Sequence, residues 1–432
     1  MGKRDSFGSK VGAILVAAGS AIGLGSIWRF PYMTGENGGG AFLLVYLLSV
    51  LVVGIPVMLA EFAIGTHTRK SPVKAYEQLS KHWKWLGYNS VIVSLLISGF
   101  YYIVAGWSLD YFVGSVTGSL YQVGDFNQYF TAFTSSWREP FYTMLFLALT
   151  HIVVAMGVQN GLERISKIIM PVLLVMLVVL VVHSATMVGA GEGYDFFFRP
   201  DFSKAFTVKT VVSAIGQAFF SLSIGLGCMI AYSSYFKQGT NLTKTSFSVS
   251  LMTFFVAMLS GMVIFPAVFS VEGLEPTAGP TLLFETLPFI FDKMHATELW
   301  SAIFFLLVAL AALTSTISFH EVITQYLQEN HNIERKKAAF ITTAATALLS
   351  VVCLKWEWFF GAFDTITADV LMPLGGLLTA IFAGWVFDKS VFRSEISNQD
   401  TLRARLFPLL HFILKWVVPI LLTVVFVWNL IF

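Results

Sequence analysis

The tetrapeptide Ile22-Gly23-Leu24-Gly25 recurs as Ile224-Gly225-Leu226-Gly227, and both copies lie inside long apolar runs. A glycine inside a helix costs about 1 kcal/mol relative to alanine, so the paired glycines predict a helix that breaks at each copy. Small residues also let helices pack closely, but two copies in corresponding positions favour the break. An opened turn in lipid leaves N–H and C=O groups that need partners, and ions or a zwitterion suit that need.

The composition is that of an integral membrane protein. Of the 432 residues 56% are hydrophobic and only 12% are charged, whereas soluble domains carry roughly 25% charged residues. The formal charge of +2 is near neutral and the basic residues are scattered, so a nucleic-acid partner is not indicated. Cys228 and Cys353 both fall in apolar segments, which leaves no pattern of a disulfide framework or a cysteine metal cluster.

Runs of about 20 apolar residues are needed to cross a bilayer as a helix, and the sequence contains eleven such runs. Basic residues concentrate in cytoplasmic loops. With the N-terminus inside, nineteen lysines and arginines fall on the cytoplasmic side and five on the other, so we expect a cytoplasmic N-terminus and an external C-terminus. The expected spans are 10–30, 41–65, 88–118, 141–158, 166–189, 208–235, 246–271, 297–326, 338–354, 366–388 and 406–431.

The two copies of the tetrapeptide fall in spans one and six. Because five crossings separate them, the two segments enter the membrane from opposite sides, which predicts two inverted halves. Paired glycine-interrupted segments in corresponding positions are a pointer to a transporter's binding site at mid-membrane. We expect one transmembrane domain over 1–432, with repeats at about 10–189 and 208–388 and an extra helix at about 406–431.

Longer motifs surround both breaks. They are Gly23-Leu24-Gly25-Ser26-Ile27-Trp28-Arg29-Phe30-Pro31, Glu36-Asn37-Gly38-Gly39-Gly40-Ala41-Phe42, Gly54-Ile55-Pro56, Gly216-Gln217-Ala218-Phe219-Phe220-Ser221-Leu222-Ser223 and Ala312-Leu313-Thr314-Ser315. Together they resemble the neurotransmitter:sodium symporter family through nearly the whole chain. The resemblance implies an all-α LeuT fold with spans one and six unwound, and sodium-coupled uptake of an amino acid. By analogy with a bacterial subgroup of eleven helices, it also implies the inner membrane.

The resemblance implies a first sodium site in which an ion is held by two kinds of oxygen. Backbone carbonyl groups of Gly19, Ile22 and Ala311 would bind it together with the hydroxyl groups of Thr314 and Ser315. Unwound carbonyls are known ligands of sodium in transporters. Taken alone, the two hydroxyls would more simply bond back within their own helix.

A second sodium site is implied at Ala21, Ser26, Ser221 and Thr253. The family usually has Asn in place of Ser26, and Asn or Asp in place of Thr253, so we expect this site in a weakened form. One sodium ion is therefore expected and a second is open.

Chloride dependence is also left open. Ala257 stands where relatives carry an acidic residue or the serine of a chloride site. Tyr46, Gln217 and Ser221 remain as candidate chloride ligands.

The substrate reading depends on Gly23, which stands where the family's monoamine carriers have Asp. Glycine there leaves room for a substrate that brings its own carboxylate, held by the Leu24 and Gly25 amides, sodium and the hydroxyl of Tyr101, with Tyr102 as the alternative. A mostly apolar lining then favours a large aliphatic or aromatic amino acid. The expected substrate-contacting residues are Ala21, Leu24, Gly25, Ile97, Tyr101, Phe220, Ser221, Ser223, Leu226, Ser315 and Phe319.

Charged residues at the two mouths resemble the family's gates. Outside, Arg29 would pair with Asp364 above an aromatic lid. Inside, Arg4 would pair with Glu329, near Tyr235. Charges at that depth are costly unless they are paired.

The sequence bears on three rival functions. An intramembrane enzyme is not indicated, because the sequence has no nucleophile elbow or Walker loop, and Thr324 replaces the second histidine of the zinc motif that begins at His320. A proton-coupled transporter is one alternative, suggested by the weakened second sodium site. The other is a channel or transport-dead sensor with the same fold.

Overall fold

The computed structural model describes residues 6–205, 207–270, 283–398 and 405–431, and the chain there is mostly helical. The helices of the first half are α1 (Lys10–Ala21), α2 (Phe30–Glu36), α3 (Gly40–Ser49), α4 (Ile55–Thr68), α5 (Pro72–Leu79), α6 (Lys84–Thr117), α7 (Ser119–Gln122), α8 (Phe126–Thr134), α9 (Arg138–Ala155), α10 (Arg164–Ser184), α11 (Ala190–Phe198) and α12 (Phe202–Ala205). Those of the second half are α13 (Val208–Leu222), α14 (Cys228–Ser233), α15 (Leu242–Phe269), α16 (Thr286–Asp292), α17 (Thr297–His331), α18 (Arg335–Lys355), α19 (Glu357–Thr365), α20 (Met372–Ile381), α21 (Lys389–Ile396), α22 (Phe407–Phe412) and α23 (Val418–Ile431).

Short π-helical turns join several of these helices into longer rods. One at Val50–Gly54 links α3 to α4, and one at Ile366–Leu371 links α19 to α20. Within the described residues, eight such rods are long and apolar enough to cross a membrane, or nine if the bent pair α1 and α2 counts as one span. The other two expected spans fall on α9, of 18 residues, and on α13, of 15 residues followed by α14. The expected count of eleven is therefore not confirmed.

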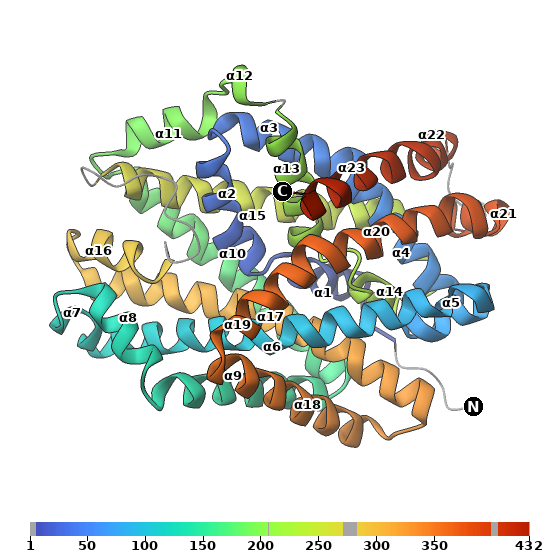
Figure 1. Cartoon of the computed structure of the whole chain (residues 1–432), viewed down its shortest axis with the longest axis horizontal. Coiled ribbons are helices and arrows are strands. Elements are labelled where there is room, and N and C mark those ends of the chain that lie inside the picture. The colour runs from blue at the N-terminus through green and yellow to red at the C-terminus, as the bar shows by residue number, and fades with distance from the viewer. Residues whose placement is uncertain (1–5, 206, 271–282, 399–404, 432) are drawn as a thin grey trace.

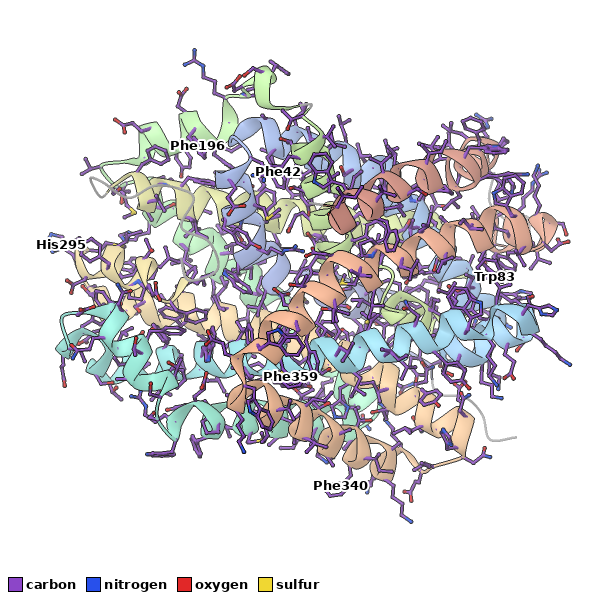
Figure 2. The ribbon with its side chains drawn as sticks, in the orientation of Figure 1. Phe42, Trp83, Phe196, His295, Phe340 and Phe359 are labelled. Carbon is purple, nitrogen blue, oxygen red and sulfur yellow. The ribbon has the colours of Figure 1, made fainter. Side chains whose placement is uncertain are left out.

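The outer surface of the helical body is apolar, as a membrane requires. Phe340 of α18 is 65% exposed and points away from the molecule, whereas Phe42 of α3 is fully buried (Figure 2). Leu348 on the same helix is 66% exposed, and Ile420 of α23 is 61% exposed. Large apolar patches are rare on soluble proteins, so these faces are suited to contact lipid.

The first helix breaks where the sequence predicts. A cap stabilises the start of α1, because the Ser9 hydroxyl accepts from the Gly12 N–H. The helix ends at Ala21, and Ile22 has non-helical backbone angles of φ −91° and ψ 76°. A π-helical turn resumes at Gly25 and leads into α2, with an axis bent by 52° from that of α1.

The sixth span breaks more completely. Ser223, Gly225 and Gly227 all have left-handed backbones, with φ of 50°, 81° and 76°. The carboxylate of Glu61 in α4 accepts the Gly225 N–H at 2.7 Å. A buried acceptor thus satisfies a backbone group that the break frees, as a membrane interior demands.

Long straight helices surround both breaks. In Figure 1, α1 and α14 lie near the middle of the molecule, with α6 and α17 side by side below them and α15 above. The helix α14 packs on α4, and α1 packs on both α15 and α17. The broken helices are therefore held inside a frame of unbroken ones.

Candidate functional site

A narrow cavity lies at the two breaks, with a volume of about 10 Å³, which is space for about one water molecule. Its lining comes from α1, the following break, α6, α13, the second break, α17 and α20. The lining residues are Ser20, Ala21, Gly23, Gly25, Ile97, Tyr101, Phe220, Ser223, Leu226, Ser315, Phe319 and Met372.

One end of this central cavity is polar. The hydroxyl oxygen of Tyr101 accepts the Leu24 N–H at 3.1 Å. The helical segment Gly25–Glu36 begins beside it, and a helix N-terminus carries partial positive charge with free N–H groups. A Cβ on Gly23 would lie 1.9 Å from Ser315 Oγ and 3.0 Å from the Tyr101 hydroxyl. Glycine thus leaves room for an anionic group at this end.

The other end is apolar and aromatic. The rings of Tyr101 and Phe319 meet edge to face, with centroids 5.3 Å apart. Ile97 and Leu226 add aliphatic surface, and Phe220 covers the side nearest Arg29. The chemistry of the lining therefore matches a ligand with a charged head and an apolar body.

The structure brings the first predicted sodium ligands together. Thr314 Oγ1 lies 3.5 Å from the Ile22 carbonyl oxygen and donates to the Ala311 carbonyl at 2.8 Å. A Cβ on Gly19 would lie 3.4 Å from the Thr314 side chain. Ser315, next along α17, lies 3.5 Å from the Ser20 carbonyl oxygen. Buried oxygens from two helices therefore converge, although Thr314 also bonds back to its own helix, as the simpler reading expects.

The second predicted set is less converged. Ser26 Oγ lies 3.4 Å from the Ala21 carbonyl oxygen. Ser221 donates to the Gln217 carbonyl at 2.6 Å, and Thr253 donates to the Val249 carbonyl at 2.9 Å. Both hydroxyls are thus engaged within their own helices.

The candidate chloride ligands are buried next to this second set. The Gln217 amide donates to Ser221 Oγ at 3.0 Å and to the Gly25 carbonyl at 2.7 Å. Among the described residues, the Tyr46 hydroxyl has no hydrogen-bond partner. Ala257 is buried and offers no ligand. A free hydroxyl and an amide are therefore present, but no carboxylate accompanies them.

The predicted outer gate is not closed by a direct ion pair. The Arg29 guanidinium lies over the Phe220 ring, 4.8 Å from its centroid, and its Nε is 3.4 Å from the Tyr32 hydroxyl. Asp364 and also Asp369, which the sequence reading did not single out, act on Arg29 only at longer range. The gate role of Asp364 stays a prediction.

On the opposite side, Arg4 lies outside the described residues, so its pairing stays a prediction. Glu329 accepts the Ser71 N–H at 2.8 Å. Tyr235 donates to Glu321 at 2.8 Å, and Glu321 also pairs with Arg335 at 2.5 Å. Tyr235 therefore belongs to a buried charge network between α17 and α18, which the sequence reading missed.

Two lining residues of the central cavity were also missed. Met372 is contributed by the start of α20, and the sequence pattern gives no signal for it. Ser20 lines the wall, and its hydroxyl is buried without a partner in the described part of the chain. Two other polar residues are structural: His320 contacts Thr324 at 3.1 Å, and Asp110 pairs with Arg138 at 2.7 Å.

Comparisons with known proteins agree with this geometry. Residues 4–132 and 133–432 match the sequence profile described as "Sodium:neurotransmitter symporter family". The sodium-dependent transporter YhdH of Bacillus subtilis (strain 168) is 36% identical over 446 residues, covering 99% of this chain and 98% of the relative. The sodium- and chloride-dependent GABA transporter 2 of Homo sapiens is 25% identical over 487 residues, covering 99% and 80%.

A solved structure is similar over the whole chain. The crystal structure of MhsT in complex with L-phenylalanine has a TM-score of 0.91 and 38% sequence identity, covering 98% of this chain and 99% of that one. The arrangement of helices around the two breaks is therefore that of a known transporter.

Proposed function

Because this chain belongs to the sodium:neurotransmitter symporter family, we propose that it takes up a large hydrophobic or aromatic amino acid together with sodium. Members of this family are multi-pass membrane transporters and not enzymes. The observation that carries the proposal is the central cavity, where a polar end at the first break faces an aromatic end.

The polar end suits the backbone of an amino acid. The substrate carboxylate would bind at the start of the segment Gly25–Glu36, where the Leu24 N–H and the Tyr101 hydroxyl already meet at 3.1 Å. The buried Ser20 hydroxyl, which has no partner among the described residues, can accept from the substrate ammonium group. Position 23 is glycine and supplies no carboxylate to pair with an amine, so an amine without its own carboxylate is disfavoured.

The apolar end supports a large side chain. Phe319, Phe220, Ile97, Leu226 and Met372 form this end, and aromatic surfaces bind aromatic rings in edge-to-face or offset geometry. The similar protein MhsT was crystallised with L-phenylalanine. We therefore place phenylalanine and the large aliphatic amino acids first among candidate substrates.

The coupling ion is sodium in this proposal. The oxygens of Ile22, Ala311 and Thr314 supply the first site. The hydroxyls of Ser221 and Thr253 already donate within their own helices, which supports a weaker second site. We therefore propose one sodium ion, with a second ion as the alternative. Chloride would bind only through neutral groups such as Tyr46 and Gln217.

We propose an alternating-access transport cycle for this fold. Sodium orders the two broken helices, the amino acid completes the site, and the outer gate at Arg29 closes before the inner side opens. In this scheme the repeats 10–189 and 208–388 are inverted, and the bundle of spans one, two, six and seven tilts against the rest. The protein would lie in the inner membrane, with its N-terminus in the cytoplasm and its C-terminus outside.

Uptake into proteoliposomes tests the proposal. A radiolabelled panel of amino acids is offered with an inward sodium gradient, with potassium replacement, with an imposed proton gradient, and with chloride varied separately. Sodium-dependent accumulation of phenylalanine or leucine is expected. Accumulation driven by protons alone would contradict the proposed coupling ion. Binding without accumulation would contradict transport itself. Competition only by glycine and alanine would contradict the proposed substrate class.

A further inference from the structure

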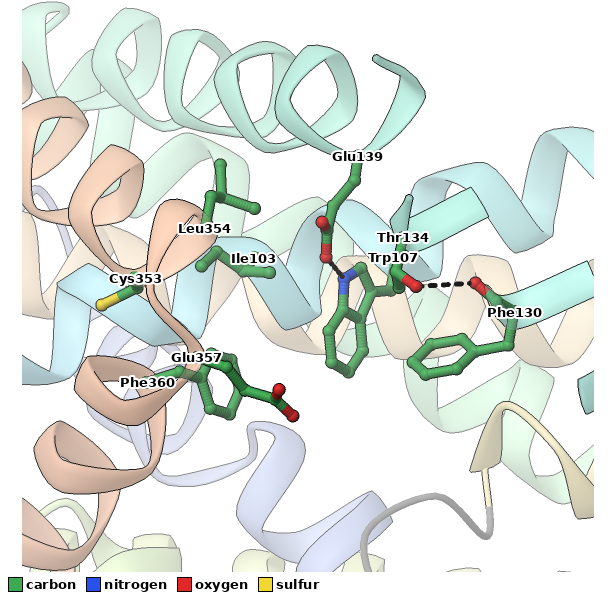
Figure 3. Close-up of a pocket in the computed structure, with 9 residues that line it drawn as sticks. All are labelled: Ile103, Trp107, Phe130, Thr134, Glu139, Cys353, Leu354, Glu357 and Phe360. Carbon is green, nitrogen blue, oxygen red and sulfur yellow. Dashed lines mark hydrogen bonds between the residues drawn. The ribbon is translucent and has the colours of Figure 1, made fainter. Parts of the chain in front are cut away.

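A second cavity, called here the outer cavity, lies among α6, α8, α9, α18 and α19 (Figure 3). Its volume is about 320 Å³, compared with about 10 Å³ for the central cavity. The two cavities share no lining residue. The outer cavity is lined by Ile103, Trp107, Phe130, Thr134, Glu139, Cys353, Leu354, Glu357 and Phe360.

Aromatic rings and carboxylates dominate this lining. The Trp107 indole stacks on Phe360, with centroids 6.0 Å apart and planes 9° apart, and meets Phe130 edge to face at 5.0 Å. Figure 3 shows the side chains of Glu139 and Glu357 reaching toward this aromatic group from two sides. Tryptophan is the best of the aromatic side chains at attracting a cation to its ring.

Positive charges from the protein do not neutralise the cavity. None of the nine lining residues is basic. Arg138, next to Glu139 in the chain, pairs instead with Asp110 at 2.7 Å. Lys355, two residues before Glu357, lies over the ring of Trp356, 4.9 Å from its centroid. Two carboxylates therefore face an otherwise neutral cavity.

Glu139 is the decisive residue. Its side chain is nine-tenths buried, and Oε1 accepts the Trp107 Nε1–H at 2.8 Å. Its other oxygen, Oε2, has no hydrogen-bond partner in the described part of the chain. A buried carboxylate is normally paired, because removing it from water is costly. Its second oxygen faces the cavity and is therefore available to a cationic ligand.

We propose that the outer cavity binds a small organic cation, with its ammonium group between the two carboxylates and the indole. A hard inorganic cation such as calcium or magnesium would need a shell of oxygen ligands, whereas Ile103, Leu354, Phe130 and Phe360 offer only apolar contacts. The mixture of carboxylates and rings suits an ammonium group that carries alkyl substituents.

The outer cavity is connected to the central cavity through a shared helix. Trp107 lies on α6, the helix that also carries Tyr101. Phe360, stacked on Trp107, lies on α19, one turn before Asp364 of the predicted outer gate. A cation in the outer cavity therefore contacts the helix that carries Tyr101 and the helix that carries Asp364.

The test uses the purified full chain in nanodiscs and isothermal titration with tetraethylammonium at fixed sodium and pH. Saturable binding at one site is expected. We expect Glu139→Gln and Glu357→Gln each to weaken binding about tenfold, which corresponds to about 1.4 kcal/mol. Glu192→Gln is the matched control, because Glu192 is an exposed residue in the first turn of α11, outside the cavity, and its affinity should equal that of the wild type.

Two further variants separate this site from others. Gly23→Ala obstructs the central cavity and should leave tetraethylammonium binding unchanged. Glu357 is exposed, so Glu357→Gln should fold normally, as its thermal unfolding midpoint would verify. Absence of saturable binding, binding unchanged in both glutamine variants, or loss of binding in Gly23→Ala alone would overturn the proposal.

Discussion

The two copies of the tetrapeptide Ile-Gly-Leu-Gly have the same sequence and different structures. At residues 22–25 the backbone bends by 52° and a helical turn resumes at Gly25. At residues 224–227 three left-handed residues, Ser223, Gly225 and Gly227, open a longer gap before α14 begins. Glycine therefore contributes space in the first copy and backbone freedom in the second.

The partners of the two breaks differ as well. At the second break, the Glu61 carboxylate binds the Gly225 N–H directly at 2.7 Å. At the first break, carbonyl groups face the Thr314 hydroxyl, and the Leu24 N–H meets the Tyr101 hydroxyl at 3.1 Å. The second break is thus anchored by a buried carboxyl group, whereas neutral hydroxyls meet the first, where we propose that the ligands bind.

The largest effect should come from Gly225→Ala. A left-handed backbone costs a residue with a Cβ roughly 1–2 kcal/mol, and this Cβ would lie 2.5 Å from the Met372 carbonyl oxygen, which cannot move without its helix. We expect loss of uptake and a lower thermal unfolding midpoint. Gly216→Ala in α13 is the control, because a Cβ there meets nothing within 4 Å. Wild-type uptake by Gly225→Ala would show that the second break does not need this conformation.

The next largest effect should come from Glu61→Ala. This change leaves the Gly225 N–H without its acceptor, and a buried unsatisfied group costs about 1–3 kcal/mol. Glu61→Gln keeps an acceptor oxygen in place and should retain most of the stability. Thermal unfolding of both variants in detergent distinguishes the two cases. Equal destabilisation by alanine and glutamine would mean that the charge, and not the hydrogen bond, stabilises the break.

A smaller and more selective effect is expected from Gly23→Ala at the first break. The added Cβ would lie 1.9 Å from Ser315 Oγ, but that side chain can rotate, so the fold should survive. Substrate affinity should fall about tenfold, equivalent to about 1.4 kcal/mol, with little change in the unfolding midpoint. Binding of labelled phenylalanine is the measurement. A large loss of stability would instead show that the first break, like the second, needs glycine for folding.

The glycine pairs predicted the positions of both breaks, because two copies in corresponding positions favour a break over close packing. The residues expected at the central cavity came from the family resemblance. Sequence patterns did not predict Met372, since its approach depends on how α20 packs against the second break. Nor did they predict the network of Tyr235, Glu321 and Arg335, in which Tyr235 meets a residue 86 positions further along the chain. The family resemblance supplied the ligand roles, and the local pattern alone would not have separated Thr314 from an ordinary helix residue.

The smallest effect should come from the charges outside the first break. Glu61 touches the second break, but Asp364 acts on Arg29 only at a distance, and Asp369 does so as well. Charge interactions between groups that water still reaches contribute about 0–1 kcal/mol, so Asp364→Asn should weaken substrate capture by about twofold to threefold. Asp369→Asn should have a comparable effect if both carboxylates share the role. Initial uptake rates at low substrate concentration measure both variants. A loss of tenfold or more in Asp364→Asn alone would mean that it pairs directly with Arg29 during transport, and the first break would then depend on a carboxylate as closely as the second does.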